Sequence, residues 1–170
     1  GLEKKYRFEV LYNWTKLEEL NIPYSNYREQ FGLKSKVVFL YGGNIGVAQD
    51  MDNVIRLAES LLDEPTAYFL LVGDGSEVKR LREIIERKKL TNITIHEAVD
   101  QQRYLAMLSE FDVGLISLDR KFKTQNFPGK MLGYMYYSMP ILASVNSGND
   151  LKEIVEEKHA GLVCINGDDA

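Results

Sequence analysis

The feature that most constrains the fold of this 170-residue chain is a regular alternation of short apolar runs with amphipathic segments of helical periodicity. The apolar runs are continuous, as is typical of parallel strands whose two faces are both covered. Amphipathic helices between such strands serve as right-handed crossovers. The sequence therefore predicts an α/β fold: a Rossmann-like, doubly wound parallel sheet of about six strands.

The predicted elements alternate along most of the chain. Strands are expected at residues 37–41, 67–72, 93–96, 112–117, 140–143 and 161–165. Helices are expected between them at residues 50–62, 76–88, 101–109, 128–138 and 149–157. Residues 1–35 are expected to form a connector with a short N-terminal helix, and residues 36–170 the Rossmann-like domain. In such a sheet, ligands bind beyond the carboxyl ends of the strands.

Composition excludes several classes of protein. The net charge is −4 and there is no long block of like charge, so no nucleic-acid partner is expected. No apolar run approaches the roughly 20 residues that a membrane helix needs. The single cysteine, Cys164, cannot form an internal disulfide, which favours a cytoplasmic protein. With only His96 and His159 beside it, no zinc or other metal site is expected.

A glycine-rich turn, Gly42-Gly43-Asn44-Ile45-Gly46, follows the first predicted strand. Exposed backbone N–H groups at a strand-to-helix turn can bind an anion. The turn is neither a Walker A loop nor a dinucleotide fingerprint. Its spacing leaves two interpretations open, a phosphate site and a tight turn without a ligand. The second glycine pair, Gly73-Asp74-Gly75, favours a turn and helix cap over direct ligand contact.

A long basic loop follows the fourth predicted strand and runs into a helix whose first turn holds Gly129 and Lys130. A cation at a helix N-terminus is unfavourable because the helix dipole is positive there. An anionic ligand at that point would remove the penalty. The alternative to an anion site is that Lys130 is an ordinary solvated lysine at the surface.

Five motifs in this order resemble the C-terminal, donor-binding domain of retaining glycosyltransferases with the GT-B fold. They are FLYGGNIGVAQDMDNVI, FLLVGDGSEVKRL, FDVGLISL, FPGKMLGYMYYSMPILA and HAGLVCINGDD. The resemblance is to the group 1 (family 4) type, which includes bacterial O-antigen and exopolysaccharide enzymes, and it extends from about residue 12 to residue 168. It implies that the domain is one half of a GT-B fold and binds a nucleotide sugar.

The resemblance also implies roles for individual residues. The substrate is expected to be a nucleoside-diphosphate sugar, with UDP as the expected nucleotide, and no cofactor or metal is required. The donor diphosphate is expected to contact Gly43, Asn44, Gly46 and Lys130. The sugar or nucleotide is expected to contact Gln49, Gly73, Val99, Gln125, Asn126, Phe127, Pro128, Gly129 and Met131.

The sequence departs from the family pattern at two glutamate positions. Counted back from Pro140, the first falls on Gln125 and the second on Gly133. Gln125 can donate a hydrogen bond to a sugar but supplies no negative charge, and Gly133 cannot hold the ribose hydroxyls. No catalytic residue is therefore assigned, and Gln125 only occupies the position of the family's first glutamate. Asn44 and Gln49 stand where the family has basic residues, so Lys130 is expected to provide most of the charge neutralisation.

The resemblance implies a missing N-terminal domain that carries the acceptor site, and the chain alone is expected to be inactive. The acceptor is expected to be a lipid-linked glycan used in surface polysaccharide synthesis. The full-length enzyme would then work in the cytoplasm or attach to the inner face of the membrane. Two alternatives remain, a binding-only α/β nucleotide domain and half of a UDP-sugar epimerase. A receiver domain is disfavoured because the first strand ends in glycines and Asn44, not in acidic residues.

Overall fold

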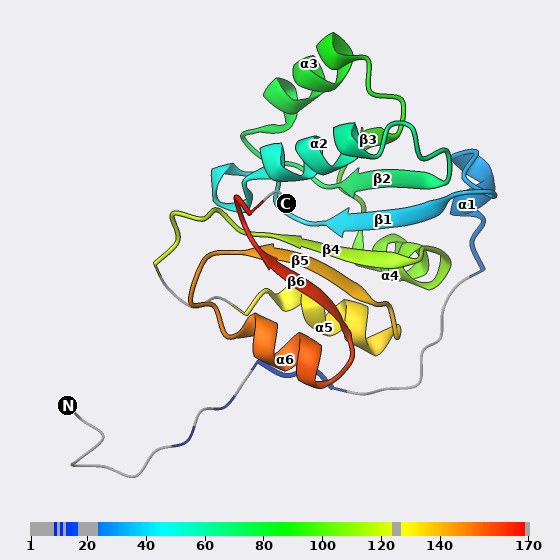
Figure 1. Ribbon diagram of the computed structural model, residues 1–170. Helices are drawn as coiled ribbons and strands as arrows, with labels where there is room; N and C mark the ends of the chain where they lie inside the picture. The colour runs from blue at the N-terminus through cyan, green and yellow to red at the C-terminus, as the bar shows by residue number, and fades with distance from the viewer. Residues whose placement is uncertain (1–8, 10, 12, 17–23, 124–126, 169–170) are drawn as a thin grey trace.

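The computed structural model describes residues 9, 11, 13–16, 24–123 and 127–168. Its centre is one parallel sheet with the strand order β3-β2-β1-β4-β5-β6 (Figure 1). The strands are β1 (Val37–Gly42), β2 (Ala67–Val72), β3 (Ile93–His96), β4 (Val113–Ser117), β5 (Ile141–Val145) and β6 (Gly161–Ile165). The helices are α1 (Tyr27–Gln30), η2 (Val47–Gln49), α2 (Met51–Ser60), α3 (Val78–Lys88), α4 (Gln101–Glu110), α5 (Gly129–Tyr136) and α6 (Leu151–Glu157).

Helices cover the sheet from both sides, as Figure 1 shows. On one face, α2 and α3 pack over β1, β2 and β3 and enclose an apolar core that includes Phe69 and Leu81. On the other face, α4, α5 and α6 enclose a second core that includes Met107, Tyr134 and Val155. The predicted doubly wound α/β fold is confirmed.

The predicted strands and main helices are all present, and the differences lie at their ends. The helix expected from residue 128 begins at Gly129, because Pro128 is extended and occupies the N-cap position. Asp50 occupies the N-cap of α2, but it adopts a left-handed conformation with φ of 41° and its side chain makes no capping hydrogen bond. Its carboxylate instead accepts a hydrogen bond from Asn166, 116 residues away in the sequence.

The sheet reverses its winding between β1 and β4, which are neighbours although two strands separate them in the sequence. Helix α5 is fixed over this junction by Tyr134, whose hydroxyl donates to the carbonyl oxygens of Leu40 in β1 (3.2 Å) and Leu115 in β4 (3.1 Å). Gly114 leaves room for the Tyr134 ring, since a Cβ at that position would lie 2.4 Å from it. The crevice at the carboxyl ends of β1 and β4 is where ligands bind in folds of this kind.

One part of the sheet is less covered than the rest. On the face that carries α2, the register places Leu115, Leu142 and Leu162 side by side across β4, β5 and β6. Leu115 is 3% exposed, whereas Leu162 on the edge strand is 69% exposed. A groove of about 300 Å³ runs between α2 and these strands, on the opposite side of the sheet from α5 and α6.

Candidate functional site

The glycine turn packs directly against the end of β2. Gly43 has φ of +120°, a conformation that side chains disfavour. A Cβ on Gly73 would lie 1.9 Å from the carbonyl oxygen of Gly43, so the two backbones are in direct contact. The N–H of Ile45 donates to the carbonyl of Asp74 at 2.8 Å. The turn is therefore held rigidly, and Gly43 and Asn44 are its exposed residues at the edge of the sheet.

Most backbone N–H groups of the turn already have acceptors. Gly43 donates to Val72 at 2.9 Å, and Gly46 donates to the side chain of Gln49 at 3.1 Å. Gly46 is also buried. Within the described part of the chain, nothing accepts the N–H of Asn44. The N–H groups of Gly43 and Gly46 therefore already have acceptors, and Asn44 presents the available N–H.

A cavity of about 500 Å³ opens beside the turn. It lies at the carboxyl ends of β1, β2 and β3 and reaches the first turn of α4. Its lining combines exposed backbone, apolar side chains and few polar groups: Gly42, Gly43, Asn44, Val72, Gly73, Asp74, Ala98, Val99, Gln101 and Tyr104. The cavity is large enough for part of a nucleotide. It brings together four residues predicted from the sequence: Gly43, Asn44, Gly73 and Val99.

Lys130 lies next to the glycine turn, although 87 residues separate it from Gly43 in the sequence. A Cβ on Gly43 would be 3.7 Å from the Lys130 ammonium, which also sits 3.4 Å from the centre of the Tyr41 ring. No carboxylate of the described residues forms an ion pair with it. Burial lowers the pKa of Lys130 to about 7. This is a desolvated cation at the sheet's ligand-binding edge without a counter-ion.

Helix geometry explains why Lys130 reaches this point. Residues four apart share one face of a helix, so Lys130 lies on the same side of α5 as Tyr134. Because Tyr134 anchors that face to β1 and β4, the first turn of α5 is held over the carboxyl ends of these strands. The alternative of a fully solvated surface lysine is therefore excluded.

The other residues predicted to contact the sugar or nucleotide differ in how exposed they are. The side chain of Met131 is 0% exposed in the core, and its N–H donates to the carbonyl oxygen of Pro128. Gln49 faces the turn, where it accepts hydrogen bonds from Asn44 and Gly46. Phe127 and Pro128 are half-buried and Gly129 is exposed at the start of α5. Gln125 and Asn126 lie outside the described residues.

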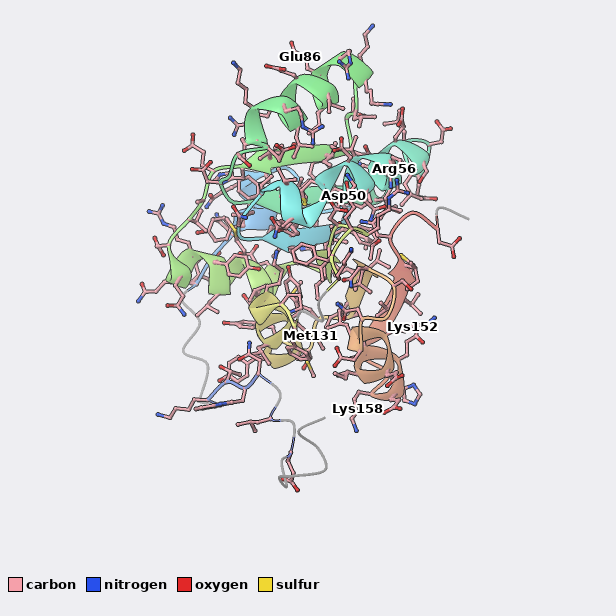
Figure 2. All side chains as sticks on the ribbon, turned by 90° about the vertical axis from the view of Figure 1, so that its left-hand side faces the viewer. Asp50, Arg56, Glu86, Met131, Lys152 and Lys158 are labelled. Atoms are coloured by element: carbon pink, nitrogen blue, oxygen red, sulfur yellow. The ribbon has the colours of Figure 1, made fainter. Side chains whose placement is uncertain are left out.

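A second set of contacts, which no local sequence pattern marks, holds the loops around the site together. Asn166, at the end of β6, is 4% exposed and donates to Asp50 at 2.9 Å and to the carbonyl of Leu118 at 2.7 Å. The N–H of Asp119 donates to Ala48 at 3.0 Å. These bonds join the segment after β1 to the loop after β4, the two segments that lead to the glycine turn and to Lys130. Figure 2 shows Asp50 close to the start of α2.

Replacing Asn166 with alanine is expected to lower the free energy of unfolding by about 2 kcal/mol, because the buried Leu118 carbonyl and the Asp50 carboxylate would each lose a donor. Urea unfolding followed by circular dichroism measures the change. Asp168→Ala is the control, since Asp168 is exposed two residues away and should change stability by less than about 0.5 kcal/mol. Equal effects of the two substitutions would show that Asn166 does not brace this junction.

The described residues contain neither a metal-binding cluster nor a membrane-spanning helix. No group of three or more His, Cys, Asp or Glu side chains is placed to hold a metal ion there. Across the same residues, no helix combines the length and apolar character required to cross a bilayer.

The doubly wound sheet with a cavity at its carboxyl edge is a common nucleotide-binding architecture, and comparison with known proteins identifies the family. Residues 24–170 match the family model described as Glycosyl transferases group 1, so the chain belongs to that family. It is similar to the putative colanic acid biosynthesis glycosyl transferase WcaI of Escherichia coli K12, with 27% identity over 131 residues. It is also similar to the probable glycosyltransferase WbjE of Pseudomonas aeruginosa, with 25% identity over 131 residues.

Each of these two alignments covers 77% of this chain and 32% of the relative, so the chain spans about a third of the length of the curated relatives it matches. Among solved structures, Anabaena HepE in complex with UDP-glucose superposes with a TM-score of 0.66 and 19% identity. That superposition covers 83% of this chain and 38% of HepE. At this level of identity the likeness shows a shared fold, that of GT-B glycosyltransferases.

Proposed function

We propose that this chain is the donor-binding domain of a retaining glycosyltransferase that transfers a sugar from a UDP-sugar to a lipid-linked glycan during bacterial surface polysaccharide synthesis. The observation that carries the proposal is the half-buried ammonium of Lys130, which has no ion-pair partner among the described residues and lies beside Gly43, a residue that lines a cavity large enough for part of a nucleotide. A diphosphate would supply the counter-ion that the site lacks, through charge-assisted hydrogen bonds.

The comparisons support UDP as the nucleotide and polysaccharide synthesis as the type of pathway. HepE was crystallised with UDP and with UDP-glucose, and WcaI is named for colanic acid biosynthesis. In our proposal, residues 36–170 form the nucleotide-sugar domain, residues 1–35 connect it, and an N-terminal domain brings the lipid-linked acceptor on the cytoplasmic side of the membrane. The diphosphate binds Lys130 and the N–H of Asn44, and the base lies near Val99.

The test is turnover by the full-length protein with UDP-sugars and a lipid-diphosphate-linked acceptor. Proton NMR of the product reports the anomeric configuration. Transfer with the donor's configuration retained supports the proposal, and inversion would overturn the retaining assignment. UDP binding without transfer would indicate the binding-only alternative. Interconversion of two UDP-sugars in the absence of acceptor would indicate an epimerase.

Binding of UDP is expected to weaken as pH rises above about 7. Burial lowers the pKa of Lys130 to about 7, so the unliganded protein loses this proton above neutrality. A bound diphosphate favours the charged lysine and raises its pKa again. Affinity should therefore fall by up to about tenfold per pH unit above pH 7, with uptake of one proton on binding. Isothermal titration calorimetry in buffers of different ionisation enthalpy measures both quantities, and a flat profile from pH 7 to 9 would contradict the role of Lys130.

The lowered pKa of Lys130 also predicts that the unliganded protein becomes more stable as pH rises, whereas its affinity for UDP falls. Between about pH 7 and the ordinary pKa of lysine, the unfolded chain binds this proton and the folded chain does not. The contribution of Lys130 to the free energy of unfolding therefore rises with pH across that window. If Lys130 titrates, UDP affinity falls with pH while the free energy of unfolding rises. General alkaline denaturation would lower both quantities.

A further inference from the structure

Among the described residues that line the cavity, Asp74 is the only carboxylate. It is the second residue after β2, and its side chain is exposed. One carboxylate oxygen, Oδ1, accepts the N–H of Gly75 at 2.7 Å, which fixes the orientation of the group. The structure describes no ion pair to this carboxylate and no donor to Oδ2. Asp74 therefore presents a fixed, available hydrogen-bond acceptor at the cavity wall.

The strand order determines where this acceptor lies relative to the rest of the site. Along the carboxyl edge, Lys130 and Gly43 lie at the junction of β4 and β1, Asp74 follows β2, and Val99 follows β3. Adjacent strands are about 4.8 Å apart, so the edge from β1 to β3 measures about 10 Å. A nucleoside diphosphate is built in the order phosphate, ribose, base. Laid along this edge with its diphosphate at Lys130 and its base at Val99, it places the ribose at β2.

We propose that Asp74 accepts hydrogen bonds from the ribose 2′- and 3′-hydroxyls of the donor nucleotide. This inference rests on the proposed function. A carboxylate is the usual acceptor for a vicinal diol because it can receive both O–H groups, and acidic residues after a strand take this role in other nucleotide-binding sheets.

The loop that carries Asp74 is held in register with the glycine turn, because its backbone carbonyl accepts the N–H of Ile45. The ribose acceptor and the diphosphate site therefore belong to one rigid unit.

The test compares Asp74→Asn with the wild-type full-length protein, using UDP and 2′,3′-dideoxy-UDP as ligands in calorimetric titrations. Asparagine keeps an oxygen that can accept the N–H of Gly75 but removes the negative charge. We expect the substitution to weaken UDP binding about tenfold or more and to change binding of the dideoxy analogue less than twofold. A purely structural role in the turn would weaken both ligands equally.

The matched control is Asp63→Asn. Asp63 is an exposed carboxylate beyond the C-terminal end of α2, and it does not line this cavity. It should leave the affinity for both ligands unchanged. If the wild-type protein binds neither ligand, the proposed function fails. If it binds UDP and Asp74→Asn affects both ligands equally or neither, the ribose assignment alone is overturned.

Discussion

Replacing Lys130 with methionine is expected to raise the Kd for UDP about 100-fold. The loss corresponds to roughly 3 kcal/mol, the usual cost of removing one partner from a desolvated, hydrogen-bonded charge pair. The stability of the unliganded protein should stay the same or increase, because methionine fills similar space and removes a charge that burial penalises. Calorimetry of UDP binding and thermal unfolding together measure the two effects.

Lys152→Met is the matched control, since Lys152 is an exposed lysine on α6 (Figure 2). It makes the same change in net charge away from the site and should alter the Kd less than twofold. If Lys130→Met binds UDP as tightly as the wild-type protein does, the diphosphate does not bind at Lys130. If binding falls only because the variant unfolds, the thermal measurement will show it.

Replacing Gly73 with alanine is expected to lower the free energy of unfolding by about 3 kcal/mol, at the upper end of ordinary overpacking costs. The added Cβ would lie 1.9 Å from the carbonyl oxygen of Gly43, and a backbone atom cannot move aside as a flexible side chain does. To relieve this clash the glycine turn must shift away from β2, which also displaces Gly43 from Lys130. Urea unfolding should show the loss, and the folded fraction should bind UDP weakly.

Gly133→Ala provides the comparison for this substitution. Gly133 lies inside α5, and an added Cβ would approach only Leu108 Cδ1, at 3.3 Å. The gain in helix propensity, up to about 1 kcal/mol, offsets that contact, so stability should change little or rise slightly. A Gly73→Ala variant as stable as Gly133→Ala would contradict the close packing of the glycine turn against β2.

The fold was predictable because its signal is local and repeated. Each strand is a short apolar run that ends at a turn residue, and each main helix has an apolar face, so the element order implies a parallel sheet without knowledge of distant contacts. The structure differs from the prediction at the ends of helices, where a single side chain determines how the helix begins. Asp50 has the sequence of a helix cap, yet its carboxylate accepts a hydrogen bond from Asn166 at the far end of the chain. A contact over 116 residues leaves no local pattern.

The site was predictable only in part, for a related reason. The loops at the carboxyl ends of the strands follow from the fold, and Lys130 was recognisable as a cation misplaced at a helix start. The glycine turn pairs with β2, and this pairing determines which of its N–H groups remain free. The sequence alone therefore did not show that Gly43 donates to Val72. Nor did it distinguish Met131, which packs in the core, from its neighbour Lys130, which faces the ligand edge.

The residues of the site come from both halves of the doubly wound sheet. The glycine turn and Asp74 belong to the half formed by β1, β2 and β3, whereas Lys130 is carried by α5 after β4. Tyr134 joins the halves through Leu40 and Leu115. In our account, the donor bridges the same junction, so the interactions that stabilise the fold also set the distance between the cation and the turn.

The central claim is tested most directly by a crystal structure of the full-length protein with UDP. Our account predicts the diphosphate within hydrogen-bonding distance of Lys130 Nζ and the N–H of Asn44, with the ribose beside Asp74 and the base beside Val99. A diphosphate bound elsewhere, with Lys130 still packed on the Tyr41 ring and without a counter-ion, would contradict it.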